Sequence, residues 1–245
     1  METINDRLLL ILGQERLERL AQARVMVLGL GGVGSSCAEA LARGGVGSLV
    51  LVDRDEVAPS NINRQALAFQ STIGRPKADV MAEMVRDINP SCEVTSVHAF
   101  VDKDRVPDQL GALPRPSYVV DAIDTVSQKL AIAAWCQEQG IPEVSAMGGA
   151  NKRDPCRLRL APIEKTQVDP LARIVRKECR KRGIRGLTVL YSDEQPREAE
   201  GKRDVIDEHG FVREGASILG TMSYFPPIMG QMLAGYVLRD LAGLL

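Results

Sequence analysis

The stretch VMVLGLGGVGS, residues 25–35, decides the fold that the chain is expected to adopt. It begins with the apolar run Val25–Leu28 and passes directly into a glycine cluster, Gly29–Gly34, that fits the pattern GxGxxG. An apolar run before such glycines and helix-forming residues after them are typical of a strand, a tight turn and a helix whose first N–H groups bind phosphate. The sequence therefore predicts a nucleotide site at the end of this strand.

The same alternation of strand and helix continues along the first half of the chain. Apolar runs predict strands at 25–28, 49–52, 94–98, 118–122 and 143–146, and helical spacing predicts helices at 5–23, 35–42, 77–88 and 128–138. Parallel strands need crossover connections, which helices supply. The expected fold class is α/β, with a Rossmann-like, mostly parallel sheet that carries helices on both faces.

The sequence changes in texture after Gly148–Gly149. Strands are expected at 157–161 and 187–191 and a helix at 171–182, while the charged stretch 192–210 is expected to be a mobile loop. No internal repeat or linker divides the chain. We expect one domain over residues 1–245, in which 151–245 forms the substrate-facing and C-terminal part.

Composition and charge narrow the class of protein. The formal net charge is -1, so a nucleic-acid partner would need a local basic patch. Five cysteines, an odd number without a CxxC pair, argue against a disulfide framework or a cysteine-rich zinc site and favour a cytoplasmic location. The apolar stretch 226–245 is interrupted by Gln231, Arg239 and Asp240. It favours a buried or dimer-facing helix over a membrane span, so no membrane association is expected.

Polar residues after the second predicted strand distinguish between nucleotides. Asp53 ends that strand and is placed to accept hydrogen bonds from ribose hydroxyls, which NAD and ATP both carry. Arg64 and Lys77 follow, and two cations suit the additional negative charge of a triphosphate. The residues therefore favour ATP. An NAD(P)-dependent oxidoreductase on the same fingerprint is the alternative from another class, although no Tyr-Lys or His-Asp catalytic pair is recognisable.

These motifs together resemble the ThiF/ubiquitin-activating superfamily and its adenylating fold. The resemblance is carried by GxGGVGS, DxD at 53–55, NxxRQ at 61–65, Lys77 and DAID at 121–124. It implies that Asp53 holds ribose, that Arg64 and Lys77 contact phosphates, and that Asp124 assists Mg²⁺ and ATP positioning. The ATP-binding set that it implies is Gly29, Gly31, Gly32, Val33, Gly34, Asp53, Asp55, Asn61, Arg64, Gln65, Lys77 and Asp124, with Arg64, Lys77 and Asp124 catalytic and Asp124 the metal ligand.

The chemistry of this superfamily suits these residue types. A carboxylate becomes a good electrophile once it attacks the α-phosphorus of ATP, because the acyl-adenylate makes AMP a leaving group, and cations lower the barrier by binding the departing pyrophosphate. Members of the superfamily often bring an N-terminal arginine into the ATP site of the neighbouring subunit. Arg7 is the candidate here, with Arg16 second. A homodimer is therefore expected.

Motifs in the second half resemble the tRNA threonylcarbamoyladenosine dehydratase group of this superfamily. They are SAMGGAN at 145–151, DP at 154–155, KT at 165–166, DPLAR at 169–173 and YS at 191–192. The resemblance implies that the activated group is the carboxylate of threonylcarbamoyl-adenosine in a tRNA anticodon loop, whose own urea group then closes a ring with loss of water. Attack within one molecule is favourable because both reactants are already tethered.

A basic run supports an RNA partner. Within residues 173–185 one anion, Glu178, accompanies seven cations: Arg173, Arg176, Lys177, Arg180, Lys181, Arg182 and Arg185. Such clusters bind phosphates without reading sequence, although they also occur as solvated helix faces. Aromatic residues make up 4%, so recognition is expected to rest on backbone charge and loop shape rather than on base stacking.

Two alternatives keep the nucleotide site and change the partner. One is adenylation of the C-terminus of a ubiquitin-like sulfur-carrier protein, although bacterial enzymes of that kind commonly carry paired CxxC zinc motifs, which this sequence lacks. The other is a non-catalytic nucleotide-binding scaffold in a sulfur-transfer pathway, and both would bring a sulfur-transfer protein partner. Cys156 and Cys179 are the candidates for a thioester or persulfide, but both are expected to be structural because free cysteines are commonly buried and inert.

Overall fold

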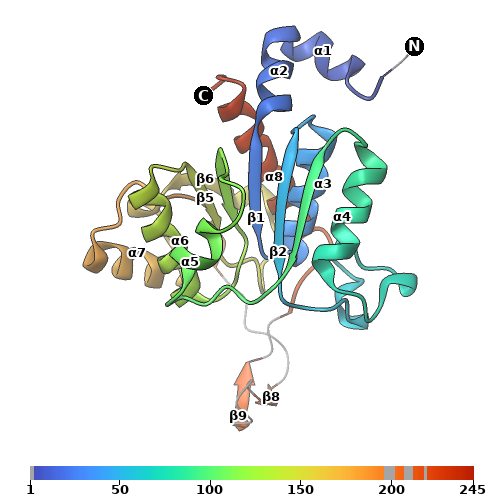
Figure 1. The fold of residues 1–245 in the computed structure, drawn as a ribbon. Coiled ribbons are helices and arrows are strands. Elements are labelled where there is room, and N and C mark those ends of the chain that lie inside the picture. Colours follow the sequence, from blue (N-terminus) through green and yellow to red (C-terminus); the bar gives the residue numbers. More distant parts are fainter. Residues whose placement is uncertain (1–2, 196–201, 207–211, 218–219) are drawn as a thin grey trace.

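A seven-stranded sheet forms the centre of the computed structural model, which describes residues 3–195, 202–206, 212–217 and 220–245 (Figure 1). The strand order is β3-β2-β1-β4-β5-β7-β6, and neighbouring strands are parallel except β6 with β7. The strands are β1 Arg24–Leu28, β2 Ser48–Asp53, β3 Glu93–His98, β4 Tyr118–Asp121, β5 Glu143–Ala146, β6 Leu158–Pro162 and β7 Thr188–Ser192. The order reverses between β1 and β4, and open α/β sheets bind ligands at such a reversal.

Helices cover both faces of this sheet. α3, α4 and α8 lie on one face, α5 and α6 lie on the other, and α7 packs against α6 (Figure 1). The helices are α1 Asp6–Leu12, α2 Gln14–Gln22, α3 Gly32–Arg43, α4 Lys77–Ile88, α5 Val106–Gly111, α6 Val126–Gln139, α7 Pro170–Arg182 and α8 Phe225–Leu241, with short 3-10 turns η1 Pro59–Asn61, η2 Gln70–Thr72, η3 Pro155–Arg157 and η4 Ile163–Lys165. The predicted α/β class with a mostly parallel sheet is confirmed.

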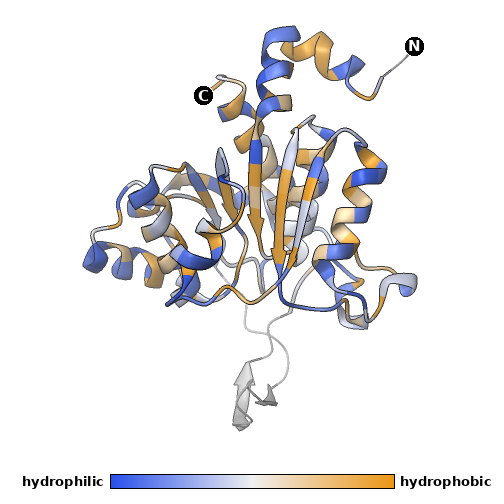
Figure 2. Cartoon of the chain, in the orientation of Figure 1, coloured by the Kyte–Doolittle hydropathy of each residue, from blue (hydrophilic) through white to orange (hydrophobic). Residues whose placement is uncertain are grey.

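Alternation along the central strand β1 explains the two helical layers. Val25 and Val27 are fully buried in the apolar cluster that includes α3 and α8, whereas Met26 and Leu28 are fully buried in the cluster that includes α5 and α6. A parallel strand covered on both faces must be apolar throughout rather than alternating, and Figure 2 shows the central strands as mainly hydrophobic. This continuous apolar run is what made β1 recognisable in the sequence.

Most expected elements are confirmed with small shifts at their ends, two expectations need correction, and one short helix was not expected. The helix expected at 5–23 is divided into α1 and α2, because Gly13 between them has a φ of 75°. The short helix α5 was not expected, since six residues are too few for a periodic apolar pattern. The mobile loop expected across 192–210 is wrong for 202–206, which form strand β8 (Lys202–Ile206) paired antiparallel with β9 (Val212–Ser217). Of the remainder, Ser192 ends β7 and 193–195 lie in no helix or strand, while 196–201 and 207–210 lie outside the described residues.

The apolar C-terminal stretch forms α8, which packs along α3. Phe225, Met229, Leu233 and Val237 recur at helical spacing and are all fully buried. The buried helix expected there is confirmed. Across the ranges that the structure describes, no helix is both long enough and apolar enough to cross a membrane.

Leu233→Ala should lower the free energy of unfolding by about 2–5 kcal/mol, because it leaves a cavity at a fully buried position between α8 and α3. Urea unfolding followed by circular dichroism measures the change. Leu245→Ala removes the same atoms from a residue that is 57% exposed and should change stability by no more than about 0.5 kcal/mol. Equal losses in both variants would contradict the packing described for α8.

Candidate active site

A cavity of about 410 Å³ opens at the carboxyl ends of the strands, where the strand order reverses. Its volume lies in the range of small-molecule sites. The predicted ATP-binding residues that line it are Gly29, Gly31, Gly32, Val33, Asp53, Asp55, Asn61, Arg64, Gln65, Lys77 and Asp124. Segments that are far apart in the sequence therefore converge on one cavity, as the motifs suggested.

The glycine turn after β1 is too tight for side chains at two positions. Gly29 has a φ of 83°, in the left-handed region that favours glycine, and a Cβ there would lie 2.9 Å from the carbonyl oxygen of Ala122. A Cβ on Gly34 would lie 1.8 Å from the carbonyl oxygen of Gly29. This close approach lets α3 begin at Gly32, so the N-terminal end of the helix, with its partial positive charge, lies at the cavity wall.

Asp53 connects the end of β2 to the glycine turn. Its carboxylate accepts hydrogen bonds from the backbone N–H groups of Leu30, at 2.5 Å, and Asp55, at 2.7 Å. A carboxylate has about four lone-pair sites, so acceptor capacity remains for ribose hydroxyls. The predicted ribose role thus fits the geometry and stays a prediction.

Lys77 is the first residue of α4 and lies buried at the cavity wall. Its side chain is 5% exposed, and its Nζ donates to Oδ2 of the exposed Asp55 at 3.0 Å. An ammonium group has three N–H donors, so this ion pair leaves donors for a phosphate oxygen. Asp55 therefore holds the cation in place without exhausting it.

The NxxRQ segment is tied to both α3 and its own turn. Ser35 of α3 accepts a hydrogen bond from the backbone N–H of Ala66 at 3.1 Å, which fixes the end of the segment against the glycine turn. The guanidinium of Arg64 donates to the carbonyl oxygen of Ser60 at 3.0 Å and to Oδ1 of Asn63 at 2.8 Å. Arg64 is partly buried and its charge is balanced by no carboxylate in the ion pairs of the described chain, so it remains available to an anion in the cavity.

Gln65 carries an unsatisfied acceptor at the cavity. Its side chain is 6% exposed, and its Oε1 has no hydrogen-bond partner among the described residues. A buried acceptor without a donor costs about 1–3 kcal/mol, so it indicates a missing donor. The oxygen is itself buried, so a nucleotide group would reach it only if the side chain turned toward the cavity.

Asp124 lies in the turn after β4, exposed at the cavity. Among the residues that the structure describes, no group of three or more His, Cys, Asp or Glu side chains could hold a metal ion. Mg²⁺ at phosphoryl-transfer sites is usually held by one or two carboxylates together with substrate phosphates, so a single carboxylate fits an ion that arrives with a nucleotide. The metal role of Asp124 remains a prediction.

A buried ion pair that was not predicted from the sequence holds the start of the turn that carries Asp124. Asp121 accepts hydrogen bonds from Nζ of Lys129 at 2.9 Å, from Oγ of Ser145 at 2.7 Å, and from the backbone N–H of Ile123 at 3.1 Å. Lys129 is 1% exposed and lies on a helix whose other buried residues are mostly apolar. The only signal in the sequence was a single lysine within a mostly apolar helical stretch, and lysines are rarely fully buried unless they are paired.

Other cavity residues come from segments without a recognisable motif. Phe100 follows β3, and the guanidinium of Arg54 lies 4.9 Å from the centre of its ring. The remaining lining residues outside every motif include Val101, Gln128, Thr221 and Pro226. Gly149 and Ala150 also line the cavity; they belong to the SAMGGAN motif, from which no nucleotide contact was predicted. Only the tertiary fold brings these loops to the cavity.

Arg7 and the two candidate cysteines lie elsewhere. Arg7 is exposed on α1, beyond the end of β1 opposite the cavity (Figure 1), so it can reach an ATP site only in a second copy of the chain. Cys179 is buried, and burial raises its pKa to about 11, which disfavours the reactive thiolate and agrees with a structural role. Cys156 is exposed, and its expected structural role stays a prediction.

Gly34→Ala and Gly31→Ala should separate folding from ATP binding. Gly34→Ala places a methyl group against backbone and should lower both the melting temperature and ATP affinity, whereas a Cβ at Gly31 meets no protein atom within 4 Å. Gly31→Ala should therefore keep the melting temperature but weaken ATP binding, because its methyl group enters the space that phosphates approach. Thermal unfolding and calorimetric titration with ATP measure the two effects. Unchanged ATP binding in Gly31→Ala would argue against phosphates at this turn.

Comparison with known proteins agrees with this geometry. The ThiF family model matches residues 5–244. The tRNA threonylcarbamoyladenosine dehydratase of Bacillus subtilis (strain 168) is 41% identical over 238 residues, which cover 95% of this chain and 92% of the relative. The molybdopterin-synthase adenylyltransferase of Salmonella typhimurium is 37% identical over 131 residues, covering 54% of this chain and 51% of the relative.

A solved structure is similar over the whole fold. The E. coli tRNA N6-threonylcarbamoyladenosine dehydratase in complex with ATP superposes with a TM-score of 0.82 at 32% identity, covering 99% of this chain and 98% of that one. This match covers nearly the whole chain, whereas the adenylyltransferase match covers about half of it. Together with the glycine turn and the convergent cations, these similarities establish that the chain belongs to the ThiF family.

Proposed function

We propose that this protein uses ATP to activate the carboxylate of threonylcarbamoyl-adenosine in tRNA, after which the modification closes a ring with loss of water. The observation that carries the proposal is the cavity in which a helix N-terminus, Arg64 and Lys77 meet at one end of the sheet. Full-length similarity to dehydratases that act on this modified nucleoside supports the choice of substrate.

The first step joins the carboxylate to AMP. A carboxylate oxygen attacks the α-phosphorus, the bond to the bridging oxygen breaks, and pyrophosphate leaves with the electron pair. Arg64 and Lys77 neutralise the charge that builds on the departing phosphates, and the preorganised N–H groups of the glycine turn add to this effect. Mg²⁺, bound with ATP and held by Asp124, would supply further charge neutralisation. No protein nucleophile is needed.

The second step takes place within the modified nucleoside. A urea group attacks the activated carbonyl carbon, a urea proton is released, and AMP leaves with one of the original carboxylate oxygens. The net change is loss of one water from the nucleoside. Because nucleophile and electrophile belong to one side chain, the step avoids the entropy cost of bringing two molecules together.

The basic helix α7 supplies the surface for RNA. It borders a groove of about 1010 Å³, along which Arg173, Lys177, Arg180 and Arg185 are exposed. Arg176 is different, because it donates to the carbonyl oxygen and Oγ1 of Thr166 and holds η4 against the helix. We assign phosphate contacts to the exposed cations and place the substrate-facing part of the domain in residues 151–245.

A second copy of the chain would complete the site. Arg7 is exposed on α1 beside Leu10 and Ile11, which are 80% and 82% exposed. Exposed apolar side chains of this size mark an interaction surface, and a symmetric dimer would cover them while carrying each Arg7 toward the partner. The homodimer therefore belongs to this proposal.

Adenylation of a sulfur-carrier protein is the second candidate. The adenylyltransferase relative favours it, but that match spans about half of this chain, whereas the dehydratase match spans 95% of it. The sequence also lacks the paired CxxC motifs of such enzymes. Under the tRNA proposal, a sulfur-transfer protein would be a partner rather than the substrate.

The free cysteines fit a location in the cytoplasm, where tRNA is also found.

Incubation of the protein with ATP, Mg²⁺ and modified tRNA should give a nucleoside that is lighter by one water. Mass spectrometry of the digested tRNA measures this product. Omission of ATP should leave the nucleoside unchanged. A preparation that adenylates a sulfur-carrier C-terminus but never changes the nucleoside mass would replace the first candidate with the second.

Lys77→Met and Arg64→Ala should each lower the rate of dehydration by at least about 100-fold, because each removes a cation that stabilises the departing phosphates. Both variants should remain folded, since Asp55, the partner of Lys77, is exposed to water. Lys103→Met removes the same charge from an exposed side chain outside the cavity and serves as the control. Near-normal turnover in either cavity variant would remove that residue from the mechanism.

Substitution of Arg173, Lys177 and Arg180 together by glutamine should weaken tRNA binding and flatten its salt dependence. The slope of log affinity against log salt concentration should become shallower by roughly 0.7–0.9 for each phosphate that these cations no longer neutralise. Filter binding at several salt concentrations measures affinity and slope. Glutamine at Arg19, Arg43 and Arg86 removes the same charge from exposed positions outside the groove. Equal effects in both triple variants would mean that net charge, and not this groove, governs RNA binding.

A further inference from the structure

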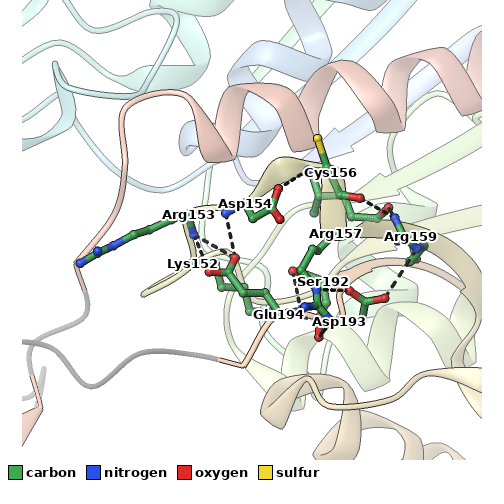
Figure 3. A network of polar contacts seen from close by, with 10 residues as sticks. Lys152, Arg153, Asp154, Cys156, Arg157, Arg159, Ser192, Asp193 and Glu194 are labelled. Carbon is green, nitrogen blue, oxygen red and sulfur yellow. Dashed lines mark hydrogen bonds and ion pairs between the residues drawn. The ribbon is translucent and has the colours of Figure 1, made fainter.

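The turn at 149–154 contributes to the cavity at one end and, through Lys152, contacts the N-cap of the basic helix α7; Figure 3 shows Lys152 and its neighbours. Gly149 and Ala150 line the cavity. Two residues later, Lys152 points into the protein interior and is 2% exposed. Its Nζ forms an ion pair with Asp169, which is 1% exposed, and donates to the carbonyl oxygen of Ser192 at 3.4 Å. The end of β7 and the wall of the cavity are thus joined through one ammonium group.

Asp169 extends this connection to the helix. It is the N-cap of α7, and its Oδ1 accepts a hydrogen bond from the backbone N–H of Ala172 at 2.8 Å. One oxygen of the carboxylate therefore fixes the first turn of α7, while the other binds Lys152. An N-cap side chain sets where a helix begins, so Lys152 acts on the position of the whole helix.

Neighbouring residues fix the turn itself. The backbone N–H groups of Arg153 and Asp154 both donate to Glu194, at 2.9 Å each (Figure 3). Asn151 and Gly220 exchange hydrogen bonds of 2.8 and 2.9 Å, and Asn151 has a φ of 58°, in the left-handed region. Such a strained conformation persists where surrounding contacts determine it.

A buried ion pair is a poor choice for stability alone. Removing both charges from water is costly, and an apolar pair of similar volume often gives equal or greater stability. What the ion pair offers is a short contact of fixed direction between two elements. Unlike Lys77, Lys152 does not line the cavity, and its ammonium group is directed at Asp169, so it does not contact a substrate there.

We infer that Lys152 is a positioning residue that acts through Asp169 to hold the RNA-binding helix α7 at a fixed place relative to the ATP cavity. The inference rests on the proposed function, because its benefit is that RNA bound along α7 presents its carboxylate to the α-phosphorus. Errors in such placement lower the rate strongly although they change binding little. The predicted signature is therefore a loss in kcat with intact affinities.

The test uses the double variant Lys152→Met/Asp169→Asn in the full chain. It contains no unpaired buried charge, and Asn is as good an N-cap as Asp, so α7 should still form. Dissociation constants for ATP and for tRNA should stay unchanged, while kcat for dehydration at saturating substrates falls at least about tenfold. Glu39→Gln/Arg43→Met removes an exposed ion pair on α3 and should keep kcat.

Hydrogen exchange supplies a second readout that needs no RNA. The backbone amides of 148–151 and of the first turn of α7 should both exchange faster in the double variant Lys152→Met/Asp169→Asn, whereas those of β1 keep their protection. The inference would be overturned by an unchanged kcat or by unchanged exchange in either segment. It would also be overturned if kcat fell only in proportion to the fraction of the protein that no longer binds ATP. If the wild-type protein does not dehydrate modified tRNA, the proposed function fails, and the exchange experiment still decides whether Lys152 couples the two segments.

Discussion

The approach of Gly34 to the carbonyl oxygen of Gly29 is the contact on which the site depends. It leaves no room for a side chain and lets α3 start directly at the end of the central strand. The cation-bearing segments are then held relative to this turn: Ser35 of α3 binds the end of the NxxRQ segment, and Asp53 binds Leu30 of the turn and the backbone of Asp55, the partner of Lys77. A change at the turn would therefore displace both cations.

Some charged groups near the site are paired within the protein, and others remain able to bind a nucleotide. The buried pairs Lys129–Asp121 and Lys152–Asp169 each join two charges within the protein and lie next to segments that line the cavity. The cations that line the cavity keep unused capacity: Lys77 has spare donors, and Arg64 forms no ion pair with a carboxylate among the described residues. This division separates residues that hold the framework from residues that await a nucleotide.

The sequence allowed the prediction of the sheet, the nucleotide turn and the convergence of its motifs, because these depend on local patterns: continuous apolar runs, glycine spacing and charged residues at strand ends. It did not reveal Lys129 or Lys152, because a lysine reads as a surface residue until the fold shows its buried partner. The cavity residues Gly149 and Thr221 were missed for a similar reason, since only the tertiary fold brings them beside β1. The expected loop at 202–206 was wrong, because strand pairing there depends on a partner strand rather than on apolar content.

The most direct test of the account follows the oxygen atoms of the carboxylate. Modified tRNA with its threonyl carboxylate labelled with a heavy oxygen isotope would be converted by the protein in the presence of unlabelled ATP, and the phosphate products would be analysed by mass spectrometry. Attack on the α-phosphorus predicts that one labelled oxygen appears in AMP. Label in inorganic phosphate alongside ADP, or unlabelled AMP, would contradict activation by adenylation.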